Sequence, residues 1–96
     1  MDIVSPTLME GLKALNCTPD IAVKEFVLMH LSERLSIFSN ESKSFEHKYG
    51  LAFPDFEKKI LSRKDEENFD EYDDYMAWKF ADEQISLLTK KLEAVK

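Results

Sequence analysis

The strongest constraint on the fold is a run of apolar residues spaced alternately three and four positions apart, followed by a second such run near the C-terminal end. This spacing places side chains on one face of an α-helix and forms the seam of coiled-coil-like packing. The first seam contains Leu28, Leu31, Leu35, Phe38, Phe45 and Tyr49, with Ser42 as its polar position, and the second contains Trp78, Ala81, Ile85, Leu88, Leu92 and Val95. The sequence therefore predicts an all-α fold built on two long helices.

Helix boundaries follow from the few prolines and glycines of the chain. Ser5-Pro6 and Thr18-Pro19 each place a capping hydroxyl before a proline at the first helical position. Gly50 can adopt the left-handed conformation at which helices commonly end. With Phe53-Pro54, these signals predict two short helices and two long ones, and the long ones cover about 19–49 and 69–95. The short helices are expected at about 6–15 and 53–62, and a polar, acidic connection at 62–68, all within a single helical domain of residues 1–96.

The two seams are comparable in length, about 32 Å from Leu28 to Tyr49 and about 26 Å from Trp78 to Val95, at 1.5 Å per residue. They could pack antiparallel as a small helical bundle within one chain, or form a dimeric coiled-coil-like assembly. A chain of 96 residues buries only about two-thirds of its unfolded surface, which favours a homodimer. The residues assigned to this oligomerisation seam are Leu28, Leu31, Leu35, Phe38, Phe45, Trp78, Ile85, Leu88 and Leu92.

Composition and charge narrow the functional classes. Hydrophobic residues make up 44% and charged residues 33% of the sequence, a balance typical of a folded domain. The net charge is −6, and the sequence lacks the basic cluster that phosphate contacts require, so direct nucleic acid binding is not expected. The N-terminus does not resemble a secretory signal, and no apolar stretch approaches the roughly 20 residues of a membrane span. Together with the lone Cys17, these features favour a cytoplasmic protein without a membrane anchor.

The groups that could support catalysis form no recognisable active-site pattern. His30 and His47 lie far apart, and neither follows a glutamate by three positions, as the helical carboxylate–iron signature requires. Cys17 precedes a helix start, where thiols can become reactive, but it has no adjacent cysteine or basic residue. The acidic segment that follows position 64 contains no glycine, which an EF-hand loop needs. We therefore expect no enzyme activity, no metal site and no cofactor.

One segment combines concentrated negative charge with aromatic residues. Between Asp65 and Trp78 the chain has seven acidic residues and no basic one. Tyrosine and tryptophan side chains anchor interfaces, and carboxylates steer a basic partner. The residues predicted to bind a partner are Phe69, Asp70, Tyr72, Asp73, Asp74, Tyr75 and Trp78. An alternative interpretation carries equal weight: Phe69, Tyr72, Met76 and Phe80 share one helical face and could pack into the core.

Two stretches, FEHKYGLAFPDFEKKI and NFDEYDDYMAWKFADEQISLLTKKLE, resemble small prokaryotic helical antitoxins of type II toxin–antitoxin pairs. In that family a long helix ends in a KYG-type turn, a short FxxF helix follows, and an acidic-aromatic segment leads into the C-terminal helix. Here these elements are Lys48–Gly50, Phe53–Phe56 and Asp70–Trp78, and the resemblance spans roughly Ala22–Leu92. It implies that the chain neutralises a small, basic toxin, for example a ribonuclease, by direct contact.

Two other functions remain open. The chain could be a self-assembling structural or adaptor protein, in which the seams serve oligomerisation and the acidic segment only maintains solubility. It could also be a degenerate ribbon-helix-helix DNA-binding regulator that uses Asp2–Val4 as its strand. The second alternative is weakened because those residues offer no Arg, Lys, Asn or Gln for base edges.

Overall fold

The computed structural model describes residues 5–63 and 68–95, and these residues form four α-helices with no β-strand among them. In chain order the helices are α1 (Pro6–Ala14), α2 (Pro19–Tyr49), α3 (Phe53–Leu61) and α4 (Phe69–Val95). The predicted all-α fold is confirmed, and no helix end differs by more than one residue from its expected position. Asp2–Val4, the strand of the ribbon-helix-helix alternative, lies outside the described residues.

The helix ends follow from local side-chain chemistry. The Ser5 and Thr18 hydroxyls accept hydrogen bonds from the backbone amides at the third helical positions of α1 and α2, at 3.2 and 3.3 Å. Gly50 ends α2 in the left-handed conformation, with φ of 65°. Asn16, just after α1, also has a positive φ of 55°. A cap that sequence reasoning missed begins α4, where the Asn68 side chain accepts from the amide of Glu71 at 3.2 Å.

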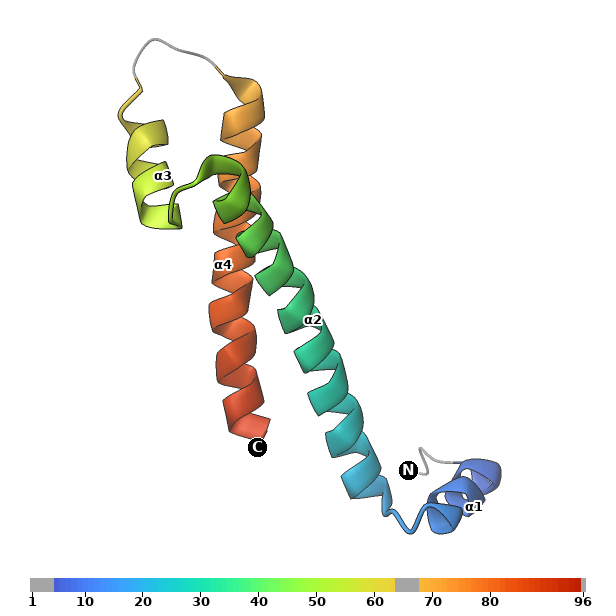
Figure 1. Ribbon diagram of the computed structural model, residues 1–96. Coiled ribbons are helices and arrows are strands. Elements are labelled where there is room, and N and C mark those ends of the chain that lie inside the picture. Colours follow the sequence, from blue (N-terminus) through green and yellow to red (C-terminus); the bar gives the residue numbers. More distant parts are fainter. Residues whose placement is uncertain (1–4, 64–67, 96) are drawn as a thin grey trace.

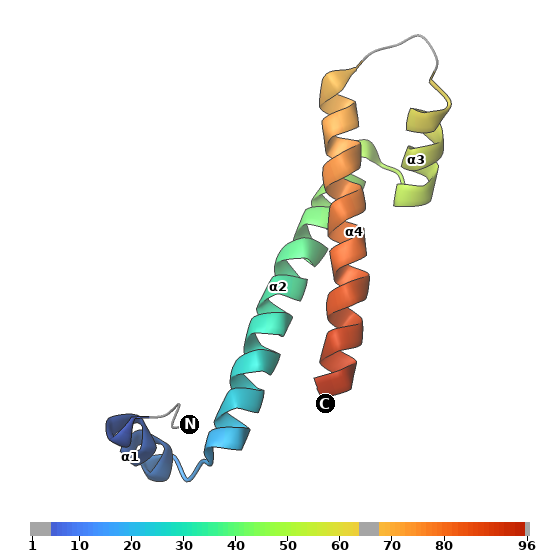
Figure 2. The same ribbon diagram turned by 180° about the vertical axis from the view of Figure 1, so that it is seen from behind.

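The two long helices pack against each other with antiparallel directions (Figures 1 and 2). The chain reverses after α2, and α3 lies beside the first turns of α4. At the opposite end of the molecule, α1 lies beside the start of α2 and projects away from α4 (Figure 1). Of the arrangements that the seams allowed, the structure contains the intramolecular one.

Each seam is covered by the other within the same chain. On α4, Trp78, Ala81, Leu88 and Leu92 are buried. The α2 seam residues, and Ile85 on α4, are half-buried. The nine residues assigned to oligomerisation therefore lie on the facing sides of α2 and α4 in one chain, and their role in a dimer stays a prediction.

Trp78 is the centre of the core. Its side chain is 1% exposed and is surrounded by aromatic rings from α2 and α3. The ring centroids of Phe53 and Phe56 lie 5.4 and 5.3 Å away, and that of Phe45 lies 5.8 Å away. Aromatic pairs at these distances contribute about 0.5–1.5 kcal/mol each beyond their buried area. Trp78 thus joins α2, α3 and α4 into one packed unit.

The molecule is elongated, with extents of 64 × 22 × 21 Å and a radius of gyration of 20.2 Å. A compact domain of this length has a radius of gyration of about 12–13 Å. The difference arises because α2 runs beyond the end of α4, so its first turns pack only against α1 (Figure 2). The helices therefore leave more surface uncovered than a compact domain does.

Candidate functional site

The acidic-aromatic segment forms the first part of α4, and the helix divides its side chains between two faces. Each position along a helix is rotated by about 100° from the one before it, so one set of rings in the segment contacts α2 and α3 and another is exposed. Tyr75 and Trp78 point inward and are 5% and 1% exposed. Phe69 and Tyr72 point outward and are 72% and 53% exposed. The seven residues predicted to bind a partner therefore do not form one surface.

Tyr75 is held by α3. Its hydroxyl donates a hydrogen bond to Oε2 of Glu57 at 2.8 Å, and its ring meets that of Phe53 edge-on, at 5.8 Å between centroids. The hydrogen bond to Glu57, and secondly burial, raise the pKa of the Tyr75 hydroxyl above its ordinary value. Tyr75 thus fixes the position of α3 against α4.

The carboxylate of Asp74 on α4 accepts hydrogen bonds from two residues of α2. We call this cluster of Lys48, Tyr49 and Asp74 the clasp. Lys48 Nζ lies 2.6 Å from Oδ2 of Asp74, and the Tyr49 hydroxyl donates to the same oxygen. These two hydrogen bonds, that of Lys48 first, lower the pKa of the Asp74 carboxyl. The hydrogen bond to Asp74 raises the pKa of Lys48, whereas burial is the main cause that raises the pKa of Tyr49. Asp74 therefore contributes to internal structure and offers little free charge to a partner.

The outward face of α4 carries four large apolar side chains at successive spacings of three, four and four. Met76 and Phe80, at 48% and 53% exposed, continue the line begun by Phe69 and Tyr72. Asp73 lies beside this line on the helix and Asp70 directly follows Phe69, and both carboxylates are exposed. We call this surface the α4 ridge, and it consists of Phe69, Asp70, Tyr72, Asp73, Met76 and Phe80.

The α4 ridge corrects one interpretation of the sequence. Phe69, Tyr72, Met76 and Phe80 do share a helical face, as expected, but the alternative that this face packs into the core is wrong, because all four are about half-exposed or more. Sequence reasoning also omitted Met76 and Phe80 from the partner-binding set. The signal that could have identified them was the phase of their spacing, which differs from that of the seam through Trp78.

Contacts with other parts of the chain hold α4 near both ends of the α4 ridge. The guanidinium of Arg63, just after α3, forms an ion pair with Glu71 in the first turn of α4. Further along, the Phe80 ring meets Phe38 of α2 edge-on, at 5.7 Å between centroids. Because these contacts hold the helix at both ends of the ridge, its exposed rings are presented in a defined orientation.

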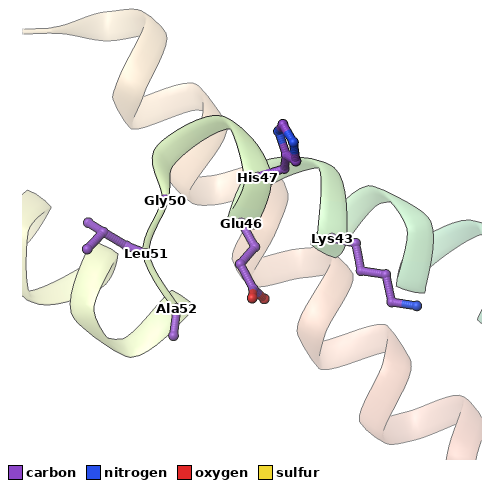
Figure 3. Close-up of a pocket in the computed structure, with 6 residues that line it drawn as sticks. All are labelled: Lys43, Glu46, His47, Gly50, Leu51 and Ala52. Atoms are coloured by element: carbon purple, nitrogen blue, oxygen red, sulfur yellow. The ribbon is translucent and has the colours of Figure 1, made fainter.

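A hollow of about 430 Å³ at the end of α2 contains several polar groups but no arrangement suited to acid–base chemistry (Figure 3). Its lining includes Lys43, Glu46 and His47. Their side chains leave the helix in different directions and do not converge on one point (Figure 3). General acid–base catalysis requires such groups within hydrogen-bonding reach of one reacting atom.

The described residues contain no group of three or more His, Cys, Asp or Glu side chains that could hold a metal ion. Within the same residues, no helix is long and apolar enough to cross a membrane. His30 stacks on Phe26, with 4.2 Å between ring centroids, and its Nδ1 lies 3.9 Å from Glu33. These neighbours place His30 on the surface of α2.

Comparison of the chain with protein families, with curated proteins and with solved structures gave no match.

Proposed function

We propose that this protein binds and neutralises a small basic protein through the α4 ridge, as an antitoxin of a type II toxin–antitoxin pair does. The observation that carries the proposal is the exposure of Phe69, Tyr72, Met76 and Phe80 in one line on a helix whose opposite face is the core. Large apolar side chains that line up on a surface mark a contact site for another molecule.

The chemistry of the ridge specifies the partner. Asp70 and Asp73 place negative charge beside the exposed rings. Carboxylates at the rim of an interface accelerate encounter with a basic surface and set its orientation, while buried aromatic rings supply most of the affinity. A basic protein with an apolar groove would match both features. In the specific form of the proposal, the partner is a toxin such as a ribonuclease. Asp70 and Asp73 then occupy a site on the toxin that otherwise binds phosphate groups.

The proposal also includes a cytoplasmic location and a homodimeric state. A self-assembling adaptor is the second candidate function, and the elongated shape of the chain favours it. The two functions differ in what the ridge contacts: a basic protein in the first, and no other protein in the second.

The geometry indicates which substitutions test the ridge. Reversing the charge of Asp74 would break its ion pair with Lys48, so a loss of binding could reflect a structural change. Asp70→Lys with Asp73→Lys alters only exposed carboxylates. A matched control is Glu46→Lys with Glu93→Lys, which changes the net charge equally at two exposed positions away from the ridge.

The experiment begins with a tagged pull-down from the host, identification of the captured protein, and reconstitution of the complex from purified components. We expect a small basic partner whose dissociation constant rises at least about 10-fold for the ridge variant and changes little for the control. A ribonuclease assay with and without the chain then tests neutralisation. Equal affinity of both variants for the partner would refute the ridge as the contact, and capture of nothing but this chain would favour the adaptor.

A further inference from the structure

The N-terminal part of the molecule carries a second apolar surface, distinct from the α4 ridge. A groove of about 440 Å³ lies between α1 and the first turns of α2. Its lining contains no charged residue. The large and branched side chains among those that line it are Leu8, Leu12, Leu15, Val23 and Phe26. We call this surface the arm groove.

The arm groove is open in the single chain. Leu15, Val23 and Phe26 are 78%, 60% and 59% exposed, and α1 has no buried residue. A helix of nine residues is not stable in water through its own hydrogen bonds, because nucleation costs more than so short a helix recovers. The amphipathic α1 therefore depends on apolar contacts with surfaces outside its own helix.

Two further large apolar side chains of α2 lie on the same side of the helix as Phe26. Met29 and Ile37 are 59% and 56% exposed, and the exposed carboxylate of Glu33 lies one turn from each. Phe26 lies two positions before the seam residue Leu28, and Met29 lies two positions before Leu31. Two positions correspond to a rotation of about 200° around the helix axis. This stripe therefore faces away from α4, and packing of the two long helices does not cover it.

We propose that a second copy of this chain covers the arm groove and the adjoining α2 stripe, forming a homodimer around a two-fold axis. A two-fold interface requires one surface to be complementary to itself. Here one chain supplies both a concave element, the groove between α1 and α2, and a convex one, the side chains of Phe26, Met29 and Ile37. Each copy can insert its stripe beside the α1 of the other.

The exposed area of the chain agrees with this arrangement. The total accessible surface is 7652 Å². A compact monomer of 11.2 kDa exposes about 5,700 Å². The excess of roughly 2,000 Å² per chain is more than the roughly 800 Å² per partner that a standard interface buries. The chain thus has enough uncovered surface for a stable dimer and for the α4 ridge to remain available.

The arm groove and the α4 ridge differ in charge, and this difference indicates a different binding partner for each. Around the arm groove, Glu10, Asp20 and Glu25 alternate with Lys13 and Lys24, and all five are exposed. This near balance causes little repulsion between two identical surfaces, whereas two copies of the acidic α4 ridge would repel each other. The arm groove fits a second copy, and the ridge fits a basic partner.

The first test is the molar mass of the purified full chain at tens of micromolar, by light scattering after size exclusion. We expect twice the 11.2 kDa mass of one chain. Phe26→Glu should raise the dimer dissociation constant at least about 30-fold, as expected for loss of an interface anchor. The control, Tyr72→Glu, introduces the same charge on the α4 ridge and should leave the dimer intact. Retained Trp78 fluorescence and helical circular dichroism in Phe26→Glu would show that α2 and α4 remain packed.

A second measurement does not depend on a destabilising substitution. A photoreactive benzophenone amino acid at Met29 should give a covalent dimer whose cross-linked peptide comes from α1 or the first half of α2. Cross-linking to α4 of the other copy, or no cross-linking at all, would overturn the proposal. A dimer that survives Phe26→Glu would also overturn it and would favour exchange of α2 and α4 between chains.

The inference rests on the homodimeric part of the proposed function and not on the toxin. A monomeric wild-type chain that still binds a basic protein through Asp70 and Asp73 would overturn the dimer alone. A dimer that binds no basic protein would overturn the neutralising role alone.

Discussion

The indole N–H of Trp78 donates a hydrogen bond to the hydroxyl of Ser42, 3.0 Å away, and the Ser42 hydroxyl in turn donates to Asp82 at 2.7 Å. Ser42 is the polar position in the seam of α2, and this chain of bonds explains it. A leucine there would leave the nearly buried Trp78 N–H without an acceptor. The bonds also fix the register of α2 against α4, since only one alignment places Ser42 opposite Trp78 and Asp82.

Replacement of Ser42 by alanine should therefore destabilise the protein. The Trp78 N–H would lose its acceptor, and an unsatisfied buried donor costs about 1–3 kcal/mol. The free energy of unfolding, measured by urea denaturation, should fall by that amount. The control is Ser44→Ala at an exposed position of α2, where a change within about 0.5 kcal/mol is expected. Equal effects of the two substitutions would show that the bonds to Ser42 contribute nothing.

Truncation of aromatic residues should separate the core from the α4 ridge. Phe56 is fully buried against Trp78, so Phe56→Ala should cost about 3–5 kcal/mol. Phe69 is 72% exposed, so Phe69→Ala should cost less than about 1 kcal/mol while weakening partner binding. Thermal and urea unfolding measure the first effect, and titration with the reconstituted partner measures the second. A large loss of stability in Phe69→Ala would mean that the ridge is buried in solution.

The clasp at Asp74 should make stability depend on pH. The pKa of Asp74 is lowered from its ordinary value of 3.8, so the folded state favours the ionised carboxylate. Its stabilising contribution is present above pH 3.8 and is lost as the pH falls through the lowered pKa of the folded protein. The difference in free energy of unfolding between wild type and Asp74→Asn should therefore be largest near neutral pH and disappear in acid. Asp73→Asn, at the neighbouring exposed carboxylate, is the control, and a difference that persists in acid would contradict the clasp.

At alkaline pH the same cluster should weaken. The pKa values of Lys48 and Tyr49 are raised, so each group favours its protonated form in the folded protein. Their contribution is complete below their ordinary values of 10.5 and 10.0 and is lost as the pH rises through the raised ones. Absorbance titration of the tyrosines should show at least one hydroxyl that ionises above pH 10. In Asp74→Asn the pKa of Tyr49 should fall toward its ordinary value, although burial keeps it raised, while that of Tyr75, raised by Glu57, should not change. Titration of every tyrosine at its ordinary value would contradict the arrangement.

The turn after α2 should depend on a left-handed residue. Gly50 has φ of 65°, and a Cβ added there would meet no atom within 4 Å, so the cost of Gly50→Ala is backbone strain alone, about 1–2 kcal/mol. Gly50→Asn should cost less, since asparagine tolerates this conformation, as Asn16 does elsewhere in the chain. Urea denaturation of both variants checks the order, and alanine tolerated as well as asparagine would contradict it.

Much of the fold could be read from local patterns. Proline and a capping hydroxyl define the starts of α1 and α2, Gly50 ends α2, and the three-four spacing identifies both long helices. Each of these signals acts within one or two helical turns, so the sequence contains all the information that they require. The structure agrees with these boundaries to within one residue.

The sequence predicted only part of the candidate site. The sequence places aromatic and acidic residues together between Phe69 and Phe80, but two apolar stripes run along that helix with different phases. Both stripes satisfy helical periodicity, and periodicity alone does not say which of them meets another helix. The surface position of Asp73 and the internal role of Asp74 differ by one position along the helix, a rotation of about 100°.

The sequence by itself determined the helices, their ends and the presence of two apolar faces on each long one. Only the tertiary structure decided that Trp78 and Tyr75 pack inward, that Phe69, Tyr72, Met76 and Phe80 stay exposed, and that the two seams cover each other. The physical reason is that helix formation depends on neighbours a few residues away, whereas burial depends on Ser42, Phe56 and other residues 18 or more positions from the rings they contact. Those contacts exist only after α2, α3 and α4 have come together.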